Sequence, residues 1–101
     1  MKKSKSERKR DREILAAYQR YLTEKELEPL FERFKEWKAN DLSYDDLTEF
    51  IHEFHKKNQK IWGIFNNSLD EEYLIFHAKK ELNMFNEKDL DKELYKLWLN
   101  L

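Results

Sequence analysis

The residues of this sequence best suited to bind a metal lie between positions 49 and 55. Glu49 and His52 are three positions apart, and His55 follows after three more. On a helix, Glu-x-x-His places two ligands one turn apart, as in carboxylate-bridged di-iron bundles. Such a site needs a second motif, but Leu74 stands three positions before His77, so only a symmetric dimer could supply the second copy. His52 and His55 could also hold zinc with one carboxylate. We keep Glu49, His52 and His55 as candidate ligands, but expect neither a bound metal nor another cofactor.

Other patterns that carry out catalysis are absent from the sequence. The chain has no cysteine, which removes thiolate catalysis, disulfides and cysteine-based zinc sites together. Gly63 is the only glycine, so no glycine-rich loop can hold a phosphate group. The 21 acidic residues do not single out a pair for general acid–base work, and no serine lies in a nucleophile elbow. We therefore expect that the protein is not an enzyme.

Residues 1–12 form a basic arm, or the basic start of a helix. Its seven Lys or Arg residues are Lys2, Lys3, Lys5, Arg8, Lys9, Arg10 and Arg12. Two acidic residues lower the charge of this segment to +5, and because the net charge of the chain is -1, the remaining residues carry -6. A basic arm on an acidic body can bind nucleic acid, or it can pair with acidic residues of its own chain or of a second copy.

We favour pairing of the arm with acidic residues over nucleic-acid binding. The sequence has no recognition-helix pattern and no aromatic residue before Tyr18, two features expected of a dedicated nucleic-acid binder. Candidate acidic partners are Asp45, Asp46 and Glu49. Exposed ion pairs stabilise a fold by only about 0–1 kcal/mol each, so we expect that deletion of the arm leaves the fold nearly intact.

The composition indicates an all-α protein. The chain of 101 residues contains one glycine, one proline and no valine, and 41% of its residues are charged. A sheet protein of this size needs turn residues about every 8–12 positions and is enriched in β-branched residues. We expect one domain, residues 1–101, with four to five helices packed as a bundle. No apolar stretch approaches 18 residues, which predicts a cytoplasmic protein without a membrane partner.

The first 38 residues contain two apolar stripes with helical spacing. The first consists of Ile14, Leu15, Tyr18, Tyr21 and Leu22, and the second of Leu27, Leu30, Phe31, Phe34 and Trp37. The centres of the two stripes lie about 140° apart if the helix is continuous. Because proline interrupts helices, we predict a break or sharp kink between Thr23 and Pro29. The alternative is one long kinked helix whose two halves face different partners.

Three further helices are predicted from capping signals. Ser43 with Asp46 begins a helix that ends at Asn66-Asn67, Ser68 with Glu71 begins the next, which runs from about Leu69 to Asn83, and Asn86 with Asp89 begins the last. We expect a core of Phe50, Phe54, Ile61, Phe76, Leu82 and Leu94. Asn58 falls inside the apolar arc of its helix, a position where a single asparagine often fixes register or oligomeric state.

Part of the sequence resembles known protein families. The residues concerned are Trp37, Leu42, Asp46-Leu47, Ile51-His52-Glu53-Phe54-His55 and Phe76-x-Ala78. They resemble a family of small, uncharacterised bacterial helical proteins with an "ERF-x-x-W … DL … IHEFH" core, over roughly residues 18–90. A more distant resemblance is to the fluorescence recovery protein of cyanobacteria, a helical dimer that acts by binding a carotenoid photoprotein.

The resemblance and the aromatic content together predict a protein that works through contacts. Aromatic residues make up 15% of the chain, and aromatic side chains dominate the energetics of protein interfaces. The resemblance implies a homodimer and points to His52, Glu53 and Phe54 as contact residues. With Trp37, Trp62 and Trp98 these form our expected interaction set. We expect a regulatory, non-enzymatic protein that binds a second copy of itself and a further, unidentified protein.

Overall fold

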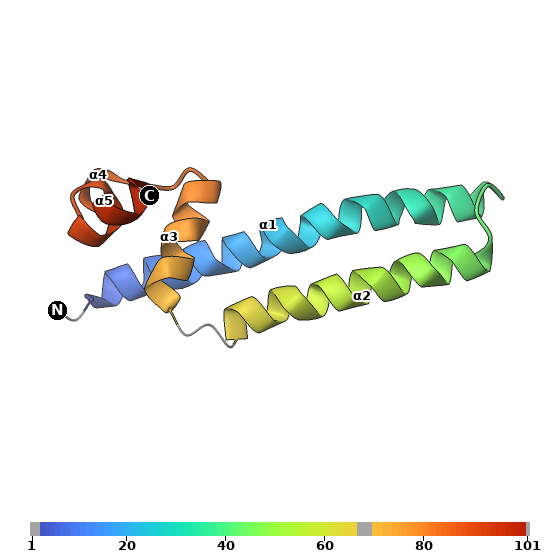
Figure 1. Ribbon diagram of the computed structural model, residues 1–101, viewed down its shortest axis with the longest axis horizontal. Coiled ribbons are helices and arrows are strands. Elements are labelled where there is room, and N and C mark those ends of the chain that lie inside the picture. Colours follow the sequence, from blue (N-terminus) through green and yellow to red (C-terminus); the bar gives the residue numbers. More distant parts are fainter. Residues whose placement is uncertain (1–2, 67–69, 101) are drawn as a thin grey trace. The chain divides into compact units, whose positions relative to one another are not determined.

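The computed structural model describes residues 3–66 and 70–100, and all the regular structure in these ranges is helical (Figure 1). The helices are α1 (Lys5–Lys38), α2 (Tyr44–Asn66), α3 (Glu71–Glu81), α4 (Glu87–Leu90) and α5 (Glu93–Leu99). This confirms the prediction of an all-α protein. Among the described residues, no helix combines the length and the apolar character needed to cross a membrane.

The helices form two compact units. The hairpin unit comprises residues 19–68, and the terminal unit comprises residues 1–18 together with residues 69–101. Helix α1 contributes its first half to the terminal unit and its second half to the hairpin unit.

The predicted break between Thr23 and Pro29 is wrong, because α1 is helical from Lys5 to Lys38; the predicted kink at this position stays a prediction. The alternative of one long kinked helix whose two halves face different partners agrees with the continuous helix and with the two units. Ile14, from the first stripe, is buried in the terminal unit, whereas Leu30, from the second, belongs to the hairpin unit. Proline in a helix interior costs roughly 3 kcal/mol. Packing of the residues around Pro29 against α2 offsets this cost.

The predicted cap of α2 is confirmed, and α1 has a cap of the same kind. The backbone N–H of Glu7 donates to Ser4 Oγ over 3.2 Å, and the N–H of Asp46 donates to Ser43 Oγ over 3.1 Å. The predicted cap at Ser68 lies outside the described residues. Asp70 is the N-cap of α3, and its side chain accepts from the backbone N–H of Tyr73.

Two asparagines end helices in a chain that has almost no glycine. Asn40 follows α1 with φ of 63°, and Asn83 follows α3 with φ of 56°. After α1, the N–H of Asp41 donates to the Glu36 carbonyl over 2.8 Å, and the N–H of Asn40 donates to the Trp37 carbonyl over 3.1 Å. This is the hydrogen-bond pattern of a Schellman motif, which places a left-handed residue just beyond the helix.

The hairpin unit has a small core. In Figure 1, α2 runs back alongside the second half of α1. Leu47 and Ile61 are its buried hydrophobic residues, so the prediction for Ile61 is confirmed. Phe54 is only half-buried, and the prediction for Phe50 is wrong because its ring lies at the exposed edge of the hairpin. Two helices alone offer too little surface to bury a full apolar stripe on each.

The terminal unit has an aromatic core. Phe76 is buried and contacts the rings of Phe85, Tyr95 and Trp98 at centroid distances of 5.6, 5.2 and 5.2 Å. The prediction that Phe76 lies in the core is therefore confirmed. Tyr95 was not predicted to lie in the core, but it does, because only 1% of its surface is exposed.

The last helix differs from the prediction. The Asn86–Asp89 capping box is present, but it starts only the four-residue helix α4, and α5 begins separately at Glu93. This shift in phase exposes Leu94, so its assignment to the core is wrong. Leu82 forms the C-cap of α3 and is half-buried rather than a core residue.

Candidate functional site

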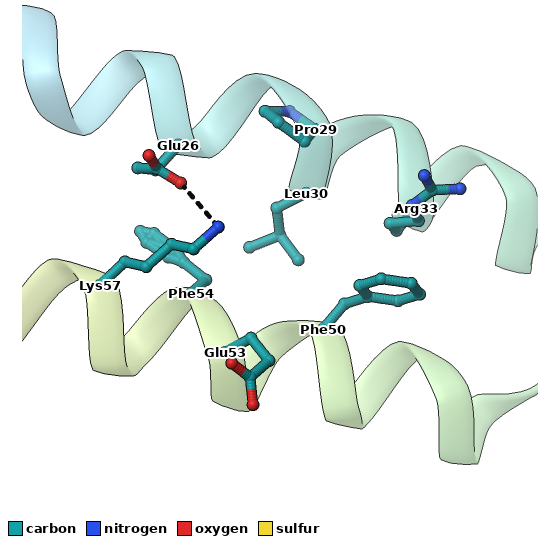
Figure 2. Close-up of a pocket in the computed structure, with 8 residues that line it drawn as sticks. All are labelled: Glu26, Pro29, Leu30, Arg33, Phe50, Glu53, Phe54 and Lys57. Atoms are coloured by element: carbon teal, nitrogen blue, oxygen red, sulfur yellow. Dashed lines mark ion pairs between the residues drawn. The ribbon is translucent and has the colours of Figure 1, made fainter.

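One edge of the hairpin unit is closed by contacts between charged and aromatic side chains (Figure 2). Glu26 on α1 pairs with Lys57 on α2 over 3.3 Å, and the guanidinium of Arg33 lies 4.9 Å from the ring centroid of Phe50. Leu30 lines a small cavity of about 170 Å³ between these contacts. Because residue numbers rise along α1 while those of their partners fall along α2, the two helices are antiparallel. We call this side the closed edge.

The hairpin unit also exposes large hydrophobic side chains away from the closed edge. Those of α1 are Leu27, Phe31 and Phe34, and those of α2 are Tyr44, Ile51 and Trp62. Each is at least 40% exposed, and Tyr44 reaches 70%. Soluble monomers rarely leave such large side chains uncovered together.

The six side chains lie on one side of the hairpin. At about 100° per residue, Leu27, Phe31 and Phe34 centre about 100° clockwise from the direction of α2, viewed from the N-terminus of α1. On α2, the set of Tyr44, Ile51 and Trp62 centres about 70° clockwise from the direction of α1, viewed from its own N-terminus. In an antiparallel pair, offsets of the same sense point to the same side. We call this surface the open face (Leu27, Phe31, Phe34, Tyr44, Ile51 and Trp62).

Asn58 lies between the contact line of the helices and the open face. Its side-chain oxygen is buried and accepts no hydrogen bond within the described part of the chain. A buried amide oxygen without a donor costs about 1–3 kcal/mol. The predicted position of Asn58 in the apolar arc thus corresponds to a polar atom that still lacks a partner.

The three tryptophans do not form one cluster. Trp37 and Trp62 belong to the hairpin unit and are exposed, at the end of α1 and on the open face respectively. Trp98 belongs to the terminal unit, where it is half-buried and lies 5.0 Å from Tyr73 between ring centroids.

The candidate metal ligands and contact residues of α2 are dispersed. Glu49, His52 and His55 are all exposed, and no group of three or more metal-binding side chains comes together within the described residues. Glu53 is exposed and pairs with Lys56 over 3.5 Å, whereas Phe54 lines the cavity beside Leu30. These residues offer no geometry for metal chemistry.

The basic arm is divided between paired and exposed residues. Lys2 lies outside the described residues. Lys3 pairs with Asp11 and Glu72, and Arg10 donates to the Met84 carbonyl over 2.9 Å and to Asp89 over 3.1 Å. These are acidic groups of the terminal unit, rather than the expected positions 45, 46 and 49. The remaining basic residues are exposed: Lys5, Arg8, Lys9 and Arg12.

A buried ionic network around Asp89 was missed by the sequence reasoning. Asp89 is 1% exposed and accepts from Lys79 Nζ over 2.9 Å, while Lys79 also donates to the Tyr95 hydroxyl over 3.0 Å. Burial raises the pKa of Asp89, but hydrogen bonds from Arg10, the Asn86 N–H and Lys79 outweigh burial and lower that pKa from 3.8 to about 2. The network has a structural role, since its charged and polar groups bond to one another.

Burial also raises the pKa of the Tyr95 hydroxyl. Burial lowers the pKa of Lys3, but its hydrogen bonds to Asp11 and Glu72 outweigh burial and raise it above the ordinary value. The first effect keeps the Tyr95 hydroxyl protonated while it accepts from Lys79, and the second keeps Lys3 charged while it donates to its carboxylate partners. The only sequence signal of the network is the spacing of Asn86 and Asp89, which identifies a capping box.

Comparison of the chain with models of protein families, with curated proteins and with solved structures finds no match.

Proposed function

We propose that this protein is a non-enzymatic interaction protein that forms a homodimer through the open face of its hairpin unit. The observation that carries the proposal is the gathering of six large, exposed hydrophobic side chains on one side of two helices. Covering such side chains yields up to about 1.5–3 kcal/mol each when burial is complete. A second copy is the partner that is always present at the same concentration as the chain itself.

Two further features support this function. The side-chain oxygen of Asn58 beside the open face is buried and lacks a partner among the described residues, and a rotation of this side chain towards the open face would let it accept a hydrogen bond from a second chain. The resemblance of the sequence to a helical dimer that regulates another protein by contact points in the same direction. Within this proposal, the dimer acts in the cytoplasm as a regulatory protein that also binds an unidentified protein.

Nucleic-acid binding by the basic arm is the alternative function, and the contacts of the arm make it less favourable. Lys3 and Arg10 are engaged by carboxylates of the terminal unit, which leaves four described basic residues for phosphate. The acidic remainder of the chain, with a net charge of -6, would repel the phosphates that these four residues have to attract.

The proposed dimer is tested by sedimentation equilibrium at tens of micromolar, using two matched variants. Ile51 on the open face is 40% exposed, and Ile64 on the other side of the same helix is 45% exposed. We expect a dimer for the full chain and for Ile64→Asp, but a monomer for Ile51→Asp. Circular dichroism should show that both variants retain their helices. A monomeric full chain would overturn the proposal, as would equal dissociation of the two variants.

A further inference from the structure

The second half of α1 carries apolar residues and residues of opposite charge at similar distances on either side of Phe31. The apolar residues are Leu27, four positions before Phe31, and Phe34, three positions after it; the charged residues are Glu28, three positions before it, and Lys35, four positions after it. Seven residues out, Glu24 faces the N-terminal end and Lys38 the C-terminal end. Every charged residue of this pattern is acidic before Phe31 and basic after it.

These positions share one face of the helix. At about 100° per residue, the seven residues of the pattern fall within an arc of about 120°. The apolar residues lie on the side of the arc nearer to α2, and Glu24, Glu28 and Lys35 lie on the outer side. This arrangement matches a helix–helix interface, in which an apolar seam is flanked by charged residues.

We infer that α1 packs antiparallel against α1 of a second copy of this chain, with the two-fold axis beside Phe31. In that register, positions whose numbers add up to about 62 face each other. Glu24 then faces Lys38 of the second copy, and Glu28 lies beside Lys35 of the second copy. The two-fold axis repeats both pairs, so four ion pairs flank one apolar seam. The inference rests on the proposed homodimer and specifies its interface.

The surface of α1 has a hollow in which the second copy can be accommodated. Glu24, Leu27, Glu28 and Phe31 line this hollow, which measures about 360 Å³. The proposed register places the second copy's Phe34 and Lys35 over it. Leu27 and Phe31 in the hollow suit the ring of the second copy's Phe34. The carboxylates of Glu24 and Glu28 suit the ammonium groups of Lys38 and Lys35 of the second copy.

The ion pairs that these charged residues form within the chain do not prevent them from pairing with a second copy. The pair of Lys35 with Glu32 spans 3.4 Å, and that of Glu24 with Arg20 spans 2.8 Å; both are solvent-exposed. Exposed pairs of this kind contribute little to stability, so Glu24 and Lys35 can turn towards a second chain. Glu24 can also accept from both Arg20 and a lysine of the second copy.

The antiparallel hairpin places α2 consistently with this axis. The contacts Glu26–Lys57 and Arg33–Phe50 both join positions whose numbers add up to 83. The position opposite Phe31 is therefore 52, and the same axis passes beside Ile51. The two hairpins then form a four-helix arrangement in which the open faces cover each other.

Charge reversal tests the register. We compare two variants of the full chain, Glu24→Lys/Glu28→Lys and Lys35→Glu/Lys38→Glu, alone and mixed, by native mass spectrometry. Alone, each variant places like charges at both ends of the seam, and we expect the dissociation constant to rise roughly tenfold or more. Mixed in equal amounts, they restore opposite charges, and we expect the heterodimer to predominate over both homodimers.

A matched control separates this register from a general effect of charge. Lys60→Glu/Lys80→Glu makes the same change in net charge as Lys35→Glu/Lys38→Glu, but at exposed positions outside the pattern, and we expect it to dimerise as the full chain does. If the full chain is a dimer but the mixed variants show no preference for the heterodimer, the register is wrong and the proposed function stands. If the full chain is monomeric, the proposed function itself fails.

Discussion

Asp89 is the residue on which the terminal unit depends most. It is buried and accepts from Lys79 and Arg10, and its oxygens also close the capping box with Asn86. Removal of one partner of a buried ion pair costs about 3–5 kcal/mol, because the other charge is left without compensation. We expect Asp89→Asn to lower the free energy of unfolding by about this amount in urea denaturation.

The double variant Asp89→Asn/Lys79→Met provides the control for that measurement. It removes both the carboxylate and the buried ammonium, so it should be more stable than Asp89→Asn alone. A single variant as stable as the parent chain would contradict the structural role of Asp89.

The lowered pKa of Asp89 predicts how stability depends on pH. The ordinary pKa of 3.8 applies to the unfolded chain, and the folded value is about 2. The unfolded chain therefore binds the proton more readily, and stability from Asp89 is complete above about pH 4 and is lost as the pH falls towards 2. The difference in pKa corresponds to about 2 kcal/mol. Urea unfolding between pH 2 and pH 5 should show this loss, and Asp89→Asn should remove this contribution to it.

At the scale of elements, Pro29 is the residue that most opposes the observed helix. It lies inside α1, where it supplies no N–H and crowds the preceding turn. Because Pro29 is exposed, its removal sacrifices little packing. We expect Pro29→Ala to raise the free energy of unfolding by about 1–3 kcal/mol, measured by urea denaturation. A loss of stability would mean that the hairpin needs the backbone bend that proline imposes.

Most of the basic arm belongs to α1 and forms ion pairs within the terminal unit, so deletion of the arm has a different expected effect on stability. Deletion of residues 1–12 would remove Arg10 and Asp11, so the earlier expectation of an intact fold no longer applies. Replacement of the four exposed basic residues by glutamine should leave stability within about 0.5 kcal/mol, whereas Arg10→Gln should reduce it. The midpoint of thermal denaturation, measured for the fourfold variant and for Arg10→Gln, checks both expectations.

The same fourfold variant tests the alternative of nucleic-acid binding. We expect the full chain to show no salt-sensitive shift with DNA or RNA in a gel-shift assay. If it binds with a slope of log K against log salt near -4, and the fourfold variant does not bind, the four exposed residues contact phosphate and our preference for pairing is wrong.

The elements themselves could be predicted where the local chemistry decides the structure. The caps at Ser43 and Asn86 were recognised because their side chains bond to backbone groups within three residues. Continuity of α1 through Pro29 could not be predicted, because it depends on packing against α2. The left-handed conformation of Asn40 was also missed, since asparagine signals it less clearly than glycine does.

At the scale of the whole molecule, the apolar pattern identified helices but not their surroundings. The apolar periodicity of the later helices was taken as a sign of burial, so Phe50 and Leu94 were placed in the core, but both are exposed. Periodicity shows which residues share a face, but it does not show whether that face meets the same chain or another one. The open face of the hairpin unit became visible only when the antiparallel register of α1 and α2 was known.

The most direct test of the self-association that we propose is a pair of distances between spin labels in two copies of the chain. The sequence contains no cysteine, so Glu32→Cys and Ala39→Cys each provide one labelling site: position 32 lies beside the proposed two-fold axis, and position 39 lies just beyond the C-terminal end of α1. With helix axes about 8–10 Å apart and a rise of about 1.5 Å per residue, the account predicts a short distance at position 32. At position 39 the copies should be separated by about 24 Å along the helix axis. Absence of an inter-chain signal, or equal distances at the two positions, would contradict an antiparallel dimer centred on Phe31.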